Sequence, residues 1–218
     1  VDYNRALDYY QQSLELFEAV DNPFQIANTL NNIGLVYNEL NKPSESIQNF
    51  ELALEKFREL NYKPGIASVQ NHIGNIYLER GDLQDALNYS MEALRINQEI
   101  GNRKETASNL RDIGRVYTKW ERYQSALDYF NRSLDISRGL GLKKEVYEIY
   151  KNISQVYENQ GKYRTALDNF KTYNALKDSS ITEEYLKQIT ELETKYETER
   201  VERELELERL KNAEQEAE

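Results

Sequence analysis

The feature that most constrains the fold of this chain is an internal repeat with a period of 40 residues. Four segments align without gaps when the sequence is written in rows of forty from residue 31. Each row carries an isoleucine, then a small residue, then a tyrosine three positions later. These positions are Ile33-Gly34-Tyr37, Ile73-Gly74-Tyr77, Ile113-Gly114-Tyr117 and Ile153-Ser154-Tyr157. Self-similarity at a fixed period of this length indicates a solenoid of stacked units.

The second half of each row repeats as well. In every row this half carries a small residue. Four positions later, three rows carry phenylalanine and the remaining row carries a serine. The small residues are Ser46, Ala86, Ala126 and Ala166, and the later ones are Phe50, Ser90, Phe130 and Phe170. Residues 1–20 match this second half through Ala6, Leu7, Tyr10 and Leu14. The chain therefore contains half a repeat followed by four complete ones.

Each row predicts two helices. Leu30, Ile33 and Tyr37 follow the spacing of three and four that places side chains on one helix face, and Ile47, Phe50 and Leu54 do the same in the second half. Turn-forming residues separate the two stripes and also separate successive rows. They are Asp21-Asn22-Pro23, Asn41-Lys42-Pro43, 61–64, Gly81-Asp82, Gly101-Asn102, Glu121-Arg122, 139–141 and Gly161-Lys162. We expect an all-α array of nine repeat helices.

This set of columns resembles the tetratricopeptide repeat, in which W-x-x-L-G-x-x-Y is followed by A, F and A. In one row it appears as Ile33-Gly34-x-x-Tyr37, Ser46, Phe50 and Ala53. The period of 40 instead of 34, and the missing proline after the second helix, resemble a long-helix branch of that family. This branch includes Gα-binding spindle-orientation adaptors and peptide-sensing bacterial regulators of the Rap type. The resemblance implies a right-handed superhelical α-solenoid (an α-α superhelix) of helix hairpins.

The repeat ends near residue 178, so we predict a repeat array over residues 1–178 and a separate C-terminal helix over 179–218. Ser180 and Glu183 form a plausible capping box at its start. The first part of this helix should cap the last hairpin through Ile181, Tyr185, Ile189, Leu192 and Tyr196. Two interpretations of the remainder stay open, a charged helix that projects into solvent or a coiled coil that pairs two chains and leads to an output domain.

Composition excludes several classes of function. The net charge is −10, and residues 181–218 alone hold 13 Glu against six Lys and Arg, so we expect no nucleic-acid binding. The absence of cysteine excludes disulfides and thiolate metal sites. No apolar run approaches the roughly 20 residues that span a bilayer. No signal peptide is visible, and because the chain starts at Val1 instead of Met, we expect a piece of a longer protein. We also expect this protein to be cytoplasmic.

In proteins of the family that this chain resembles, the first helix of each hairpin lines a concave groove, so we examined the groove positions. Asn31, Asn71 and Asn75 would form an amide ladder able to pair with an extended peptide backbone. Arg111, Arg115 and Lys151 would form a cationic cluster suited to an acidic ligand, since arginine can bind a carboxylate with two hydrogen bonds. The alternative is that these are ordinary solvated residues, with the cations balanced by Glu148 and Glu158.

The resulting hypothesis is a protein–protein interaction module without catalytic residues, cofactor or metal. We expect it to be the sensory or scaffold region of a larger signalling protein, such as a histidine kinase, a nucleotide cyclase or a transcription regulator. The alternative is a structural scaffold, forming homodimers through the C-terminal helix, or a free-standing adaptor. The single histidine, His72, is interpreted as a polar surface or packing residue, and the single tryptophan, Trp120, as a packing residue at the hairpin turn.

Overall fold

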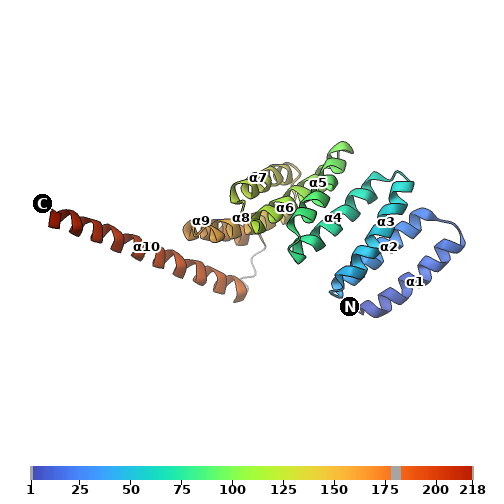
Figure 1. Cartoon of the computed structure of the whole chain (residues 1–218), viewed down its shortest axis with the longest axis horizontal. Coiled ribbons are helices and arrows are strands. Elements are labelled where there is room, and N and C mark those ends of the chain that lie inside the picture. The colour runs from blue at the N-terminus through green and yellow to red at the C-terminus, as the bar shows by residue number, and fades with distance from the viewer. Residues whose placement is uncertain (1, 178–182, 218) are drawn as a thin grey trace. The chain divides into compact units, whose positions relative to one another are not determined.

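The structure is a computed structural model that describes residues 2–177 and 183–217. Ten α-helices and no β-strand are present in this described part of the chain. Their bounds are α1 Tyr3–Ala19, α2 Pro23–Glu39, α3 Pro43–Glu59, α4 Lys63–Arg80, α5 Leu83–Glu99, α6 Arg103–Lys119, α7 Tyr123–Gly139, α8 Lys143–Asn159, α9 Tyr163–Leu176 and α10 Glu183–Ala217 (Figure 1). The predicted all-α fold with helix hairpins is confirmed. The predicted boundary at 178 and the capping box at Ser180 lie outside the described residues, as do the side chains of Ile181 and Tyr185.

A left-handed residue ends each of the first eight helices at intervals of 20 residues. These residues are Asp21, Asn41, Asn61, Gly81, Gly101, Glu121, Gly141 and Gly161. In each turn the next backbone N–H donates to the carbonyl five residues earlier, as Asp82 does to Tyr77 at 2.9 Å. This hydrogen bond is the Schellman closure, which satisfies a carbonyl that the helix end leaves open. The turn-forming residues in the sequence therefore predicted the helix ends correctly.

Glu121 is the least suited of these eight residues to its backbone conformation, with φ at 59°. A side chain larger than that of asparagine or aspartate costs about 1–2 kcal/mol in the left-handed region, whereas glycine adopts it without a steric penalty. We expect Glu121→Gly to raise the free energy of unfolding by about 1 kcal/mol. Urea denaturation followed by circular dichroism measures this change. Gly81→Ala, at the equivalent turn, should give a loss of similar size, and an unchanged midpoint in both variants would contradict the prediction.

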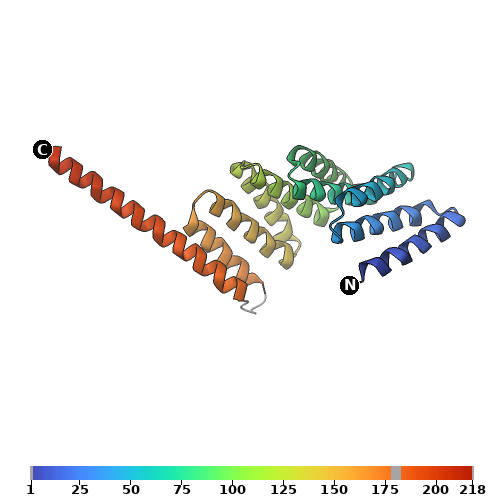
Figure 2. The same ribbon diagram turned by 60° about the horizontal axis from the view of Figure 1, so that its bottom comes forward.

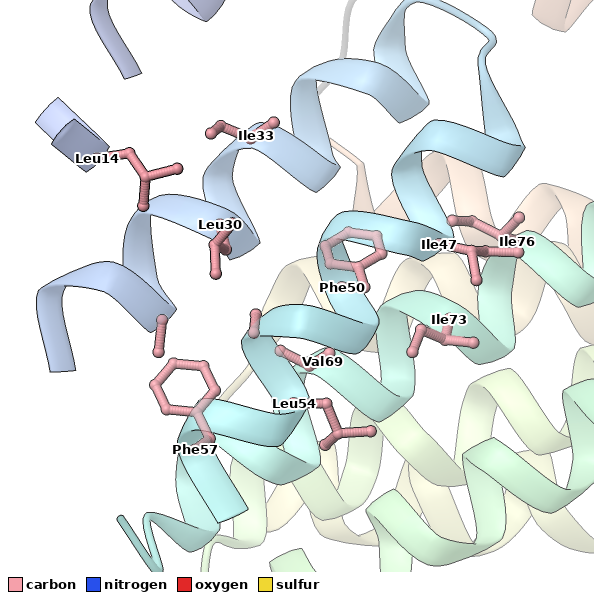
Figure 3. Close-up of a cluster of buried hydrophobic side chains, with 12 residues drawn as sticks. Leu14, Leu30, Ile33, Ile47, Phe50, Leu54, Phe57, Val69, Ile73 and Ile76 are labelled. Atoms are coloured by element: carbon pink, nitrogen blue, oxygen red, sulfur yellow. The ribbon is translucent and has the colours of Figure 1, made fainter. Parts of the chain in front are cut away.

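Two compact units divide the chain, residues 1–136 and residues 137–218, and each is described by itself. In the first unit, aliphatic and aromatic side chains of α1 to α4 form one buried cluster, part of which Figure 3 shows. Phe50 of α3 is fully buried in it. A Cβ atom built on Gly34 would lie 2.7 Å from the Phe50 ring, so only glycine permits this helix spacing. The small column of the first helix and the aromatic column of the second helix are therefore in contact in this hairpin.

The small positions also carry hydrogen bonds between the helices of a hairpin. The Ser46 hydroxyl of α3 donates to the Gly34 carbonyl of α2 at 2.7 Å. In the last hairpin the roles are exchanged, since the Ser154 hydroxyl of α8 donates to the Ala166 carbonyl of α9 at 2.8 Å. A buried serine is therefore satisfied in both hairpins, which removes the usual cost of burying a hydroxyl group.

In the second unit, the first part of α10 packs against α9 (Figure 2). Leu192 is buried in a cluster with Phe170 and Tyr173, and Ile189 packs on its edge. Lys195 forms an ion pair with Glu158 of α8, and this hydrogen bond raises the pKa of Lys195. The later apolar residues of α10 are about half exposed. They are Val201, Leu205, Leu207 and Leu210.

Candidate peptide-binding site

The first helices α2, α4 and α6 of the first unit carry five of the six predicted ligand-binding residues. Asn31 belongs to α2, Asn71 and Asn75 belong to α4, and Arg111 and Arg115 belong to α6. We call the surface that these five residues define the first-helix face. It is built by the 40-residue period, because residues 40 positions apart occupy equivalent places on neighbouring first helices.

A buried carboxylate that the sequence analysis missed joins three of these side chains. Asp112 of α6 is only 2% exposed. Its Oδ2 accepts a hydrogen bond from Asn71 Nδ2 at 3.3 Å. Its Oδ1 accepts from Arg115 Nη1 at 3.3 Å and lies 3.5 Å from Arg111 Nη2. Because a buried carboxylate needs partners, the two guanidinium groups and the amide stabilise its charge, and it in turn fixes their positions.

The network continues from Asn71 into the core between α5 and α6. Asn109 Nδ2 donates to Asn71 Oδ1 at 2.9 Å, and Asn97 Nδ2 donates to Asn109 Oδ1 at 2.7 Å. Asn97 and Asn109 are 3% and 1% exposed. Such a connected set of buried amides is well satisfied and therefore rigid. This set of amides holds the Asn71 side chain on its buried side, so both Oδ1 and Nδ2 of Asn71 have hydrogen-bond partners inside the protein.

Arg115 and Asn75 form the exposed end of the network. Arg115 Nη1 also donates to Asn75 Oδ1 at 3.1 Å, and Asn75 Nδ2 donates to the Asn71 carbonyl at 3.1 Å. The Arg115 side chain is 38% exposed. Both of its hydrogen bonds use Nη1, so Nε and Nη2 have no protein acceptor among the described residues. These donors are fixed in position and available to a ligand.

Two of the predicted residues are not joined to this network in the described part of the chain. Asn31 is half-buried, and its Oδ1 atom is buried without a hydrogen-bond donor. Lys151 belongs to the second unit, where its Nζ lies 5.9 Å from the centre of the Tyr173 ring. There it lines a cavity of about 100 Å³ together with side chains of α10, including Gln188 and Leu192. The amide ladder and the cluster of three cations remain predictions.

The sequence carried a signal for the missed residues. Asn97 occupies a column that holds Phe57 in the first complete row, and Asn109 occupies a column that holds Val69 and Ile149. Two amides replace apolar residues in adjacent helices, 12 positions apart, and buried polar residues need partners. A hydrogen bond between Asn97 and Asn109 could therefore have been predicted, and the same reasoning could have been extended to Asp112.

His72, interpreted as a packing residue, stacks on the Phe50 ring with a centroid distance of 5.3 Å. Its Nε2 lies 3.4 Å from the Ser68 hydroxyl. Burial lowers the pKa of His72, and the charge of Asp112 only partly opposes this shift. Trp120, also interpreted as a packing residue, lies against the cluster of Leu78, Ala86 and Val116.

The lowered pKa of His72 predicts a loss of stability in weak acid. At His72 the unfolded chain binds a proton more tightly than the folded chain does. The stability that neutral His72 contributes is therefore complete above about pH 6.5 and is lost as the pH falls below that value. We expect the urea midpoint to fall from about pH 7.5 to about pH 5.5 by more in the wild type than in His72→Gln. Equal losses in the two proteins would show that carboxylates alone account for the acid sensitivity.

The arrangement is suited to binding by hydrogen bonds and charge. No group of three or more His, Asp or Glu side chains positioned to hold a metal ion occurs among the described residues. None of the described helices is both long enough and apolar enough to cross a membrane. The chemistry that these residues offer is fixed N–H donors and cationic groups beside a buried carboxylate.

Comparison with known proteins supports this interpretation of the fold. A family model described as the tetratricopeptide repeat matches residues 2–59 and 65–139. No curated protein matches the sequence. The solved structures that are similar to the chain in fold include the following three, at sequence identities that indicate the fold alone.

The first of these structures is the apo form of RapI, with a TM-score of 0.77 and 20% identity over 86% of this chain and 69% of that one. Aspartyl phosphate phosphatase F from Bacillus subtilis has a TM-score of 0.76 and 16% identity over 87% of this chain and 50% of that one. BtubC from P. vanneervenii has a TM-score of 0.75 and 13% identity over 90% of this chain and 85% of that one.

Proposed function

Because this chain belongs to the tetratricopeptide repeat family, we propose that it is a protein–protein interaction module whose first-helix face binds an extended peptide or protein segment. Solenoids of this kind use long, continuous surfaces for binding, which suits an extended ligand. Lys151 of α8 belongs to the second unit and stays a separate predicted ligand contact. In this proposal the first helices line a concave groove, and the protein is cytoplasmic and not an enzyme.

The observation that carries the proposal is the fixed position of Arg115 and Asn75 at the exposed end of a buried network. A flexible arginine loses side-chain entropy when it binds a ligand, and this loss weakens binding. Here Asp112 and Asn75 already hold the guanidinium group of Arg115, so most of this side-chain entropy is lost when the protein folds and not when it binds a ligand. Ordinary solvated arginines, such as Arg95 on α5 at 61% exposure, lack a buried carboxylate of this kind.

The donors of Arg115 favour a ligand with one carboxylate over a polyanion. Its Nη1 is used by Asp112 and Asn75, which leaves Nε and Nη2. These two donors suit a single acidic side chain or a C-terminal carboxylate, which they could bind through two hydrogen bonds. Charge reversal of both arginines is a poor test, because it would place three carboxylates together and destabilise the fold.

Selection from a random peptide library, with the purified chain as bait, tests the proposal. We expect enriched peptides with a common acidic position. Arg115→Gln should weaken their binding by about tenfold, the loss typical of one charge-assisted hydrogen bond. Arg95→Gln on α5 is the matched control and should bind normally. The proposal fails if no peptide is enriched, or if the enriched peptides bind the two variants equally.

The proposal extends to a role as the sensory or scaffold region of a larger signalling protein. The likeness in fold to RapI and to an aspartyl phosphate phosphatase supports this setting. Among the described side chains of α10, Leu192 is the only one that is buried, and it packs against α9. Two ion pairs also hold α10, Lys195 with Glu158 and Glu193 with Lys171, and both are partly exposed. Partly exposed ion pairs stabilise weakly, so ligand binding near α8 could shift α10 and any domain attached to it.

A structural scaffold is the second candidate, and the exposed apolar residues of α10 favour it. Val201, Leu205, Leu207 and Leu210 are each about half exposed and would be covered if two copies of α10 paired. Light scattering of the chain with and without residues 197–218 tests this pairing. A dimer that becomes a monomer on truncation supports the scaffold, and a monomer in both cases removes it.

A further inference from the structure

The first part of α10 is in register with the first helices of the array. Helix α10 begins at Glu183, which is 40 positions after the start of α8 at Lys143. Ile189 of α10 packs at the edge of the cluster that includes residues of α9, and it lies 40 positions after Ile149, a fully buried residue of α8. The first part of α10 therefore occupies the position of a first helix in a fifth row.

A cavity of about 100 Å³ lies between α8, α9 and α10, within the second unit. Lys151 of α8 and Glu191 of α10 both line it, and these two residues share the column of Arg111. Lys151, Gln155 and Glu191 are exposed, so the cavity opens to solvent. Its polar lining includes Lys151, Gln155, Glu158, Gln188 and Glu191. A side chain of a ligand can therefore enter this cavity between the two first helices.

The inner wall of the cavity is apolar. Phe170 of α9 and Leu192 of α10 line it, and each is 5% exposed. The two side chains belong to the same buried cluster, so their positions are fixed by packing. This wall suits the methylene groups of a side chain whose polar end reaches the polar lining.

The charges around the cavity balance one another among the described residues. Glu158 forms an ion pair with Lys195 and accepts a hydrogen bond from Gln155 Nε2 at 3.3 Å. Lys151 and Glu191 add one positive and one negative charge. A ligand carboxylate or ammonium group would meet no excess of the opposite charge here, and a charged group costs more to remove from water than an amide does. The balance therefore favours a neutral ligand group.

The lining offers both a donor and acceptors to such a group. Lys151 has no ion pair or hydrogen bond among the described residues, and its Nζ lies 5.9 Å from the centre of the Tyr173 ring. Its N–H donors are thus available to a ligand. The carboxylates of Glu158 and Glu191 each have about four lone-pair positions, more than one partner fills.

We propose that this cavity binds the carboxamide side chain of a glutamine in a partner protein. Lys151 Nζ donates to the carboxamide oxygen, and the carboxylates of Glu158 and Glu191 accept from its NH2 group. The two methylene groups of the glutamine lie on Phe170 and Leu192. This site goes beyond the proposed function, because it uses no residue of the first-helix face.

Occupation of the cavity would hold α10 against α8. The glutamine contacts both helices, so local opening of α10 destroys the site and ligand binding opposes that opening. At a ligand concentration of about ten times the Kd, the backbone amides of residues 189–199 should exchange with solvent about tenfold more slowly.

The probe is N-acetylglutamine methylamide, titrated into the purified chain and followed by ¹⁵N NMR. We expect saturable shifts of the side-chain NH2 resonances of Gln155 and Gln188, with a Kd of about 1–10 mM. The corresponding glutamate and lysine compounds have the same backbone amides, so their comparison isolates the side chain. Each should bind at least about fivefold more weakly.

Lys151→Met should weaken binding of the glutamine probe by about tenfold, because it removes a charge-assisted hydrogen bond. Lys144→Met, at an exposed lysine of the same helix, is the matched control and should bind normally. The proposal is overturned if no probe shifts these resonances, if the glutamate or lysine probe binds as tightly as glutamine, or if the two variants bind equally. The peptide selection depends on Arg115 and this titration on the second unit, so the failure of one is distinguishable from the failure of the other.

Discussion

Gly114→Ala should lower the free energy of unfolding by about 3 kcal/mol, although alanine is the better helix former. The added Cβ would lie 2.6 Å from the Phe130 ring, and three ring atoms lie within 2.9 Å of it. Phe130 is fully buried, so the ring has no free space into which it could move. The helices α6 and α7 must separate or the ring must leave its rotamer, and both cost stability. Urea denaturation followed by circular dichroism measures the loss.

The second complete row supplies the control for this prediction. A Cβ on Gly74 would meet the Ser90 hydroxyl at 2.9 Å, the Tyr89 Cβ at 3.3 Å and the Ala86 carbonyl oxygen at 3.4 Å. The serine hydroxyl can rotate away, and the other two contacts need a shift of only a few tenths of an ångström. Gly74→Ala should therefore be close to neutral, because the helix propensity of alanine, worth about 1 kcal/mol, offsets the contact. In a Phe130→Ser background, Gly114→Ala should also become nearly neutral. A large loss in that background would show that the ring is not the cause.

This contrast also shows what the sequence could predict. The 40-residue period identified a small column and an aromatic column, and the structure brings these two columns together where Gly34 meets Phe50. The helix ends were predictable for the same reason, because Gly81-Asp82 and the other turn residues recur in step with the repeat. Such features depend on the repeat itself, so every row gives evidence for them.

The buried network was not predictable in the same way, because it belongs to one place in the array. The columns of Asn97, Asn109 and Asp112 hold other residue types in other rows, so the signal for their role is a departure from the repeat in one row, and no other row supports it. Asn71 was predicted to face a ligand, and the structure shows that both atoms of its amide are engaged inside the protein. Which of two neighbouring polar residues faces inward depends on packing between helices that the repeat does not specify.

Replacing Asn97 by Phe, or Asn109 by Val, should each cost about 2 kcal/mol, because each change leaves the other amide buried without its partner. These residues are 3% and 1% exposed, so water cannot restore the lost hydrogen bond. Asn109→Val also removes the donor to Asn71 Oδ1. The free energies of unfolding of both single variants are compared with that of the wild type.

The double variant should recover most of this loss, to within about 1 kcal/mol of the wild type. The chain already contains the apolar version of the pair, since Phe57 and Val69 occupy the same columns one repeat earlier and are buried in one cluster. The expected coupling between the two changes is about 3 kcal/mol, and purely additive losses would contradict it. A stable double variant would have Asn71 held by Asp112 alone. If the double variant recovers stability but binds peptide more weakly, the two amides position the first-helix face. An apolar pair would then stabilise the fold equally well.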